Sequence, residues 1–427
     1  MSTLASRTHA LADAVPSVNE CGLGLLRQPG SVLFGPGQRR QAPQIVAALG
    51  KHVLVVTDAR MATTAEFGEL IEGLRAEGAD VSVFAETAPE LPRENVVETV
   101  RRFIDQPIDV LVGIGGGSCM DLAKVVSVVL AHRGDIRDYY GEFLVPGPGL
   151  PVVTIPTTGG TGAEVTCISV IFDEEKGMKV GVASPYLEAT AAIIDPELTL
   201  TCPPGLTAAT GADALTHLIE AFTGRAKNPT PAEIAKKLYV GKNVLADLYA
   251  RAGLAIAGRS LEAVVANPSD LQARSNTSFA AYCAGMAINT AGTAGAHAIQ
   301  SPIGNLTHTP HGFGVGALLP YVMRYNLPAR VSEFAEVGCL LGVSEAAQPE
   351  LDQAKAAIER VDAILAALGV PGDLKTLGLQ AGDLGYVADQ SLLATRLIDN
   401  NPRTLTRGVV LSILEKGYAG DRSWDLG

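Results

Sequence analysis

The sequence predicts a parallel α/β region followed by an all-helical region, and three observations lead to this prediction. Short segments rich in Val and Ile alternate with helical patterns over the first half, which is typical of a parallel sheet covered on both faces. Strand patterns stop at Pro203-Pro204, and helical patterns rich in Ala, Leu and Gly follow almost to the end. A chain of 427 residues, 47% of them hydrophobic, can bury more than one core. We therefore expect an N-terminal extension over residues 1–30, an α/β domain over 31–204 and a helical domain over 205–427.

The predicted elements of the first half follow one another in strand–helix order. Helices are expected over residues 62–77, where Gly78 ends the pattern, and over 94–104, after Pro92. The expected strands are short and nearly continuously apolar, as strands buried on both faces must be. They cover residues 52–57, 80–84, 108–113, 151–155 and 191–195.

The composition of the chain argues against several classes of binding partner and of structural site. Lys and Arg number 33 against 45 Asp and Glu, so the formal net charge of −12 disfavours binding to nucleic acid or to an anionic membrane. No apolar run approaches the roughly 18 residues of a membrane helix. The six cysteines lie far apart without a CxxC pair, which argues against a disulfide scaffold or a cysteine zinc site. We expect a cytoplasmic protein.

A glycine-rich segment follows one of the expected strands and leads into a helix. Its sequence is GIGGGSCMDLAK, residues 113–124, and the glycines from Gly115 to Gly117 allow the backbone to approach a bulky anion. The N-terminus of the following helix offers free amides and a positive dipole end to a pyrophosphate. Ser118 and Asp121 have the spacing of a capping box, which predicts where the helix begins. A tight strand-to-helix turn is the alternative, and the segment alone leaves the class of nucleotide open.

A second loop, PTTGGTGAEVT at residues 156–166, also follows an expected strand. Hydroxyl groups and glycines at the carboxyl end of a strand suit contacts to ribose and phosphate. Asp58 closes the strand expected at 52–57, where a carboxylate accepts from ribose hydroxyls and repels a 2′-phosphate, so NAD is favoured over NADP. Taken singly, the loop could be an exposed turn and Asp58 a turn former.

Four of the seven histidines lie in the helical half, together with a carboxylate at helical spacing. Asp213 and His217 are four residues apart, which places both on one helix face. His297 belongs to a helix of small residues expected over 291–297, and His311 lies in a loop that enters the next helix. One Asp with three His suits Fe(II) or Zn(II). For any one histidine a structural role is the commoner explanation, and the sequence does not show that the four residues converge.

Four motifs, in this order, resemble the iron-containing (group III) alcohol dehydrogenases. They are GGGSxxDxAK at 115–124, PTTGGTGxEVT at 156–166, GxDALTHxIEA at 211–221 and PHG at 310–312. A late NPR at 401–403 resembles another signature of the family, and the resemblance extends from about residue 31 to the C-terminal region. It implies a Rossmann-like dinucleotide-binding domain, an all-helical metal-binding domain and a cleft between them, the fold that dehydroquinate synthase shares with iron-type alcohol dehydrogenases.

The resemblance also implies which residues form the site. The catalytic metal would be held by Asp213, His217, His297 and His311. The pyrophosphate would lie on Gly116, Gly117 and Ser118, with Asp121 near the nicotinamide and Asp58 near the adenosine ribose. Further dinucleotide contacts would come from Thr157, Thr158, Thr161, Thr166 and Lys179, the last on an apparent hairpin after residues 173–177.

One position departs from the pattern of many relatives. They carry a second histidine four residues after the third ligand, where this chain has Ser301. That histidine lies near the active centre in relatives, so the departure bears on substrate scope and proton handling. His308, three residues before His311, is either a functional replacement or, as the more ordinary explanation, a surface histidine beside the ligand loop.

The expected function is a metal-dependent, NAD(P)-linked alcohol dehydrogenase, or aldehyde or ketone reductase. Hydride would pass between C4 of the nicotinamide and the carbon of a metal-bound alkoxide or carbonyl. The alternatives are a nicotinoprotein or hydroxyacid–oxoacid transhydrogenase with tightly bound NAD, a metal- and NAD-dependent lyase, and a non-catalytic scaffold. The expected partner is a small alcohol, aldehyde or ketone, with no nucleic acid and no membrane, in a homodimer or larger homo-oligomer.

Overall fold

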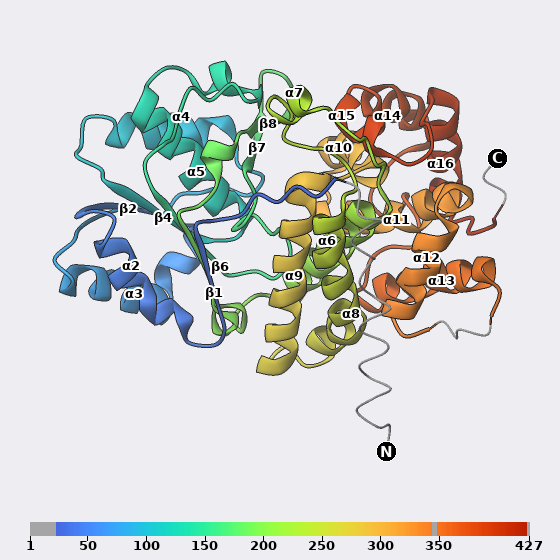
Figure 1. The fold of residues 1–427 in the computed structure, drawn as a ribbon, viewed down its shortest axis with the longest axis horizontal. Coiled ribbons are helices and arrows are strands. Elements are labelled where there is room, and N and C mark those ends of the chain that lie inside the picture. The colour runs from blue at the N-terminus through green and yellow to red at the C-terminus, as the bar shows by residue number, and fades with distance from the viewer. Residues whose placement is uncertain (1–22, 344–347, 425–427) are drawn as a thin grey trace.

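The computed structural model describes residues 23–343 and 348–424, in which an α/β region lies beside a helical region (Figure 1). A six-stranded sheet has the order β1-β9-β6-β4-β2-β3, and all of its neighbouring strands are parallel. The strands are β1 Ser31–Phe34, β2 His52–Val56, β3 Asp80–Phe84, β4 Val110–Gly115, β6 Val152–Pro156 and β9 Ala191–Ile194. The parallel α/β fold predicted for the first half is confirmed.

Alternate side chains of the central strands pack against helices on opposite faces of the sheet. These helices are α2 Ala42–Ala47, α3 Ala65–Ala76, α4 Arg93–Phe103 and α5 Gly117–His132. Val53 and Val55 of β2 join the core that α2 and α3 cover, whereas Leu54 and Val56 join the core under α4 and α5 (Figure 1). Because successive side chains point to opposite faces, a strand covered on both faces must be apolar throughout.

The described chain after residue 204 contains helices and no β-strand. The helices are α6 Pro204–Thr223, α7 Pro231–Ile234, α8 Val244–Ala266, α9 Leu271–Ala291, α10 Gly295–Thr307, α11 His311–Asn326, α12 Val331–Leu340, α13 Glu350–Ala367, α14 Leu384–Ser391, α15 Thr395–Asn400 and α16 Arg407–Ala419. Helix α6 is buried on every side over residues 207–223, because α8, α9 and α11 pack around it. Within the described ranges, every helix is too short or too polar to cross a lipid bilayer.

Segments at the start and in the middle of the α/β region contact the helical region. The described part of the expected extension, residues 23–30, lies against α9, where the Leu25 carbonyl accepts from the Thr290 hydroxyl at 3.0 Å; residues 1–22 lie outside the described residues. The second segment is the hairpin indicated around residues 173–177, which belongs to a small sheet of β5 Gly141–Glu142, β8 Met178–Ala183 and β7 Ile168–Asp173. At its turn the Gly177 carbonyl accepts from the Asn305 amide of α10 at 3.1 Å.

The predicted capping box at the start of α5 is wrong. Helix α5 begins at Gly117 with Gly116 as its N-cap, and no side chain caps it. Ser118 lies inside the first turn, and the Asp121 carboxylate instead accepts from the Val170 amide of β7 at 2.9 Å. The Asp121 carboxylate, which the local spacing had predicted to cap α5, therefore makes a tertiary contact with β7 instead.

The continuous helix expected over 291–297 is also wrong. Helix α9 ends at Ala291, and Gly292 has a φ of 77°, a conformation that suits glycine and ends the helix. Helix α10 begins at Gly295, so His297 stands in its first turn. Small residues had masked this break, because they are compatible with either helix.

Candidate metal and nucleotide site

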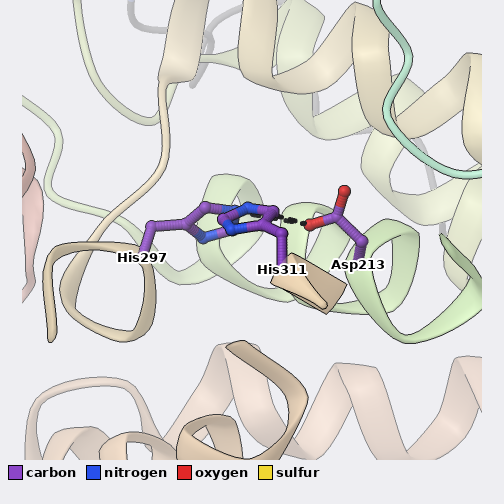
Figure 2. Close-up of side chains that lie close together, drawn as sticks. All are labelled: Asp213, His297 and His311. Atoms are coloured by element: carbon purple, nitrogen blue, oxygen red, sulfur yellow. Dashed lines mark ion pairs between the residues drawn. The ribbon is translucent and has the colours of Figure 1, made fainter. Parts of the chain in front are cut away.

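Asp213, His217, His297 and His311 converge from three helices. Helix α6 supplies Asp213 and His217 one turn apart, while His297 lies in the first turn of α10 and His311 begins α11. The Nε2 atoms of the three histidines lie 3.5 Å, 3.6 Å and 3.6 Å from Oδ1 of Asp213. Figure 2 shows the imidazoles of His297 and His311 together, facing the Asp213 carboxylate.

These donor atoms fit a divalent metal. Ligand atoms of Asp213, His297 and His311 all lie within 4.8 Å of one another. Among the described residues, Oδ1 of Asp213 and Nε2 of His297 are buried and have no hydrogen-bond partner, a state that native structures avoid. In a tetrahedral site with bonds of about 2.1 Å, neighbouring donors lie about 3.4 Å apart, close to the separations observed from Oδ1. Asp213, His297 and His311 therefore have the chemistry and the spacing of a metal ligand set. His217 lies outside this group of three, although its Nε2 is 3.5 Å from the same carboxylate oxygen.

Burial and neighbouring charges favour the ligating protonation states of Asp213, His217 and His311. Burial would raise the pKa of the Asp213 carboxyl, but the surrounding imidazoles, His217 first, hold that pKa well below its usual range. Burial lowers the pKa of His217. Burial, and then the Lys179 ammonium, lower the pKa of His311 well below its usual range. At neutral pH the carboxylate is ionised and these two imidazoles are neutral, as a metal requires.

Glu220 and Gln300 orient two of the rings. Nδ1 of His297 donates to Oε2 of Glu220 at 2.7 Å, and Nδ1 of His311 donates to Oε1 of Gln300 at 2.8 Å. Because these oxygens only accept, the proton lies on Nδ1 and Nε2 faces Asp213. Burial lowers the pKa of His297, but the Glu220 and Asp213 carboxylates together raise it to about 9. Neither residue was singled out from the sequence, although the spacing of Glu220, seven residues after Asp213 on one helix face, was an available signal.

The two glycine loops meet at the carboxyl edge of the sheet. Strands β4 and β6 are neighbours, and Gly115 is paired with Pro156 where each strand ends. A Cβ on Gly117 would come within 3.0 Å of the Thr161 side chain, so the two loops touch. The N-terminus of α5 carries no side-chain cap, which leaves its backbone amides available to an anion such as a pyrophosphate.

The remaining residues predicted to contact the dinucleotide lie around these loops. Thr157, Thr158 and Thr166 are buried, and the Thr157 hydroxyl has no partner among the described residues. Asp58 does form a turn, since its Oδ1 accepts from the Met61 amide at 2.9 Å. Its other oxygen lies 3.7 Å from Sγ of Cys119, beside the glycine loop.

Lys179 lies between the two regions. It is part of β8 and forms an ion pair with Glu90. Its charge also lowers the pKa of His311, after the effect of burial. The lysine therefore acts electrostatically on the ligand set although the hairpin belongs to the α/β region.

The second loop packs directly on helices of the metal site. A Cβ on Gly160 would lie 2.3 Å from Cβ of Thr210, three residues before Asp213 on α6. A Cβ on Gly162, which has a φ of 66°, would lie 2.3 Å from Cα of Gly285 on α9. These contacts need glycine. The first joins the candidate nucleotide loop to α6, the helix that carries two of the candidate ligands, and the second joins it to α9.

Lys124, the last residue of the first glycine motif, secures the second loop from inside. Its side chain is fully buried, and Nζ donates to the carbonyls of Ala163, Thr166 at 2.9 Å and Ile168 at 3.2 Å. It also pairs with Asp121 at 3.4 Å. One ammonium group thus ties α5 to the chain on both sides of residue 166.

We expect Lys124→Met to lower the free energy of unfolding by about 3 kcal/mol, because buried carbonyls and the Asp121 carboxylate lose their donor. NAD affinity should fall at the same time, since the loop loses its anchor. Denaturant titration and NAD titration measure the two effects. Lys237→Met is the control, because Lys237 is exposed, lies beyond the end of α7 and pairs with Glu233 at the surface, so a change beyond about 0.5 kcal/mol there is not expected. An unchanged NAD affinity in Lys124→Met would contradict the anchoring role.

The structure shows where Ser301, His308 and the late NPR motif lie. Ser301 stands on α10 one turn after His297. His308 is exposed and ends α10 in the left-handed conformation with a φ of 53°, as the more ordinary explanation expected. Asn401 of the NPR motif exchanges two amide hydrogen bonds with Asn326, at 2.8 Å and 2.9 Å, and so secures the end of α11.

Two family models match the chain, one on each side of residue 204. The model described as iron-containing alcohol dehydrogenase matches residues 29–196. The model described as the C-terminal domain of the Fe-containing alcohol dehydrogenase family matches residues 207–418.

Individual proteins match over nearly the whole chain. Long-chain-alcohol dehydrogenase 1 of Geobacillus thermodenitrificans is 35% identical over 381 residues, which is 88% of this chain and 92% of that protein. A crystal structure of 1,3-propanediol oxidoreductase superposes with a TM-score of 0.86 at 31% identity, covering 93% of this chain and 100% of that one. Sulfoacetaldehyde reductase from Bifidobacterium kashiwanohense, solved in complex with NAD+, superposes with a TM-score of 0.80 at 27% identity over 94% of this chain and all of that one.

Proposed function

Because the chain belongs to the iron-containing alcohol dehydrogenase family, we propose that it interconverts a small alcohol and its aldehyde or ketone at the ligand set around Asp213, with NAD as the hydride carrier. One observation supports this assignment above the others. Three imidazoles face a single carboxylate oxygen, at 3.5 Å to 3.6 Å, and α6, which carries that carboxylate, packs against the second glycine loop at Gly160. A metal and a dinucleotide would therefore be held close to each other.

The ligand set determines what a bound metal would supply. Asp213 and Nε2 of the three histidines would hold Fe(II) or Zn(II). Because this set carries only one negative charge, a divalent ion bound there would keep positive charge and would supply Lewis-acid chemistry to a substrate oxygen. Asp213 remains ionised in this setting. Glu220 and Gln300 hold His297 and His311 with Nε2 turned inward. The positive charge of Lys179, on the hairpin, helps to keep the His311 imidazole neutral by lowering its pKa.

The α/β region would hold NAD across the carboxyl edge of the sheet. Gly116, Gly117 and Ser118 present the uncapped amides of α5 to the pyrophosphate. Asp58, next to the glycine loop, would accept from the adenosine ribose, and its charge disfavours the 2′-phosphate of NADP. Thr157, Thr158, Thr161, Thr166, Asp121 and Lys179 complete the proposed cofactor contacts.

The proposal also includes the domain division, the cellular location and the oligomeric state of the protein. The division into domains at residues 204 and 205 is supported by the start of α6 at Pro204 and by the two family matches. A cytoplasmic location is supported by the free cysteines of the described chain. A homodimer or larger homo-oligomer is the arrangement that most soluble oligomers adopt.

The test is NADH formation by protein purified without oxygen and loaded separately with Fe(II) and Zn(II), against primary alcohols, diols and hydroxy acids. We expect turnover that needs both the added metal and free NAD, and the more active metal identifies the physiological one. If no NADH forms with any of the three substrate classes, and NAD co-purifies with the protein, the result would favour the transhydrogenase instead.

A further inference from the structure

Glu220 is a buried carboxylate that contacts the candidate ligand set through His297. It lies on α6, three residues after His217, and is 3% exposed. An ionised carboxylate in such a position is costly unless donors surround it. Three N–H groups do so: the amides of Ala294 at 2.8 Å and Ala296 at 2.7 Å, and Nδ1 of His297 at 2.7 Å.

All three donors belong to the segment that presents His297. Ala294 is the N-cap of α10 and Ala296 lies in its first turn, so the carboxylate caps the helix start from another helix. The same carboxylate holds the imidazole, whose Nε2 then lies 3.6 Å from Oδ1 of Asp213. One side chain therefore sets both the backbone position and the ring orientation of this ligand.

The histidines differ in what orients them. The Nδ1 partner of His297 is a charged carboxylate, whereas that of His311 is the neutral amide oxygen of Gln300. A carboxylate accepts more strongly than an amide, and it increases the basicity of the ring nitrogen that faces the metal. The structure thus provides an internal comparison between a charged and a neutral partner.

We propose that Glu220 is a positioning residue, which holds His297 in the tautomer and orientation that ligate the metal and which contributes more to metal retention than Gln300 does. This inference rests on the proposed metal site. The carboxylate acts through His297, so its removal should loosen the metal even where the four ligands are intact.

The direct test is Glu220→Gln, which keeps the shape of the side chain but not its charge. We expect the metal dissociation constant, measured by competition with a chelator, to rise by about 10- to 100-fold. The absorption spectrum of the Co(II)-loaded variant should also change, because His297 no longer holds its orientation. Gln300→Met should raise the dissociation constant by less. A larger effect from Gln300→Met, or an unchanged dissociation constant in Glu220→Gln, would overturn the proposal.

Asp195→Asn is the matched control for a purely structural effect. Asp195 is also a buried carboxylate that accepts backbone amides, those of Gly37 and Glu197 at 3.0 Å, but it stands after β9 in the α/β region. Its replacement should lower stability and leave both the metal dissociation constant and the Co(II) spectrum unchanged. If Asp195→Asn loosens the metal as much as Glu220→Gln does, the effect of Glu220 is general destabilisation and the proposal fails.

A measurement on the unaltered protein covers the case in which Glu220→Gln does not fold. In Zn(II)-loaded protein with nitrogen-15-labelled histidine, Nδ1 of His297 should carry a proton, and an unprotonated Nδ1 would overturn the proposal. The proposed function fails separately, if the unaltered protein neither binds metal nor forms NADH. A protein that does both, but whose Glu220→Gln variant holds metal equally well, contradicts only the role of Glu220.

Discussion

Asp213→Ala should lose the divalent metal and slow NADH formation by more than about a hundredfold, since the loss of a residue that merely orients a ligand already costs 10- to 100-fold. The physical reason is that Oδ1 of Asp213 is the atom that all three histidine Nε2 atoms face. Without it the imidazoles keep no common anionic partner. Metal content and initial rates measure the two losses.

NAD binding by Asp213→Ala should remain close to that of the unaltered protein, because the proposed cofactor contacts lie in the α/β loops. Titration of the variant with NAD checks this. His308→Ala is the control, since His308 is exposed only three residues before His311, and it should keep both metal and activity. Full activity in a metal-free Asp213→Ala protein would refute the assignment of the ligand set.

Gly312→Ala should lower the free energy of unfolding by about 3 kcal/mol and reduce turnover about a hundredfold. A Cβ at Gly312 would lie 1.8 Å from the carbonyl oxygen of Ala209, four residues before Asp213 on α6. Carbon and oxygen normally approach to about 3.3 Å, so α11 would have to withdraw. Overpacking of a core typically costs 1–3 kcal/mol or more. The withdrawal would carry His311 away from Asp213, and about 1 Å of displacement can cost a hundredfold in rate.

Gly68→Ala is the matched control for Gly312→Ala. Gly68 lies inside α3, and a Cβ there would meet nothing within 4 Å. This substitution should raise the free energy of unfolding by about 0.5–1 kcal/mol, because alanine loses less backbone entropy in a helix. Denaturant unfolding, metal affinity and turnover are measured for both variants. Retention of unaltered metal affinity in Gly312→Ala would show that close contact between α6 and α11 is not needed for the site.

Local sequence patterns were sufficient to predict most strands of the α/β region. Strand β3 runs over the expected residues 80–84, and β2 and β9 end one residue earlier than expected, because apolar strands bounded by turn residues carry their own signal. The strand expected at 108–113 begins and ends two residues later, at Val110–Gly115, since pairing of Gly115 with Pro156 extends it into the glycine loop. Glycine carries no periodic signal, so only the neighbouring strand determines that end.

Side chains with tertiary partners were the ones that local reasoning misjudged. Asp121 had the spacing of a cap but binds the Val170 amide of the hairpin. Lys124 follows it in the same motif and carried no expected role, yet its buried ammonium holds the second loop. In both cases the partners lie at least 39 residues away in the chain, and spacing within a helix contains no information about them.

The sequence by itself determined the alternation of strand and helix, the residue types of the ligand set and the order of the motifs, because these depend on neighbouring residues. Only the tertiary structure decided that Nε2 of three histidines on three helices faces one oxygen of Asp213. It also decided that Glu220 and Gln300 orient two of the rings. The physical reason is that such convergence requires helices to approach until their backbones touch, as α11 approaches α6 at Gly312 and Ala209, and packing between distant segments is not a property of any local pattern.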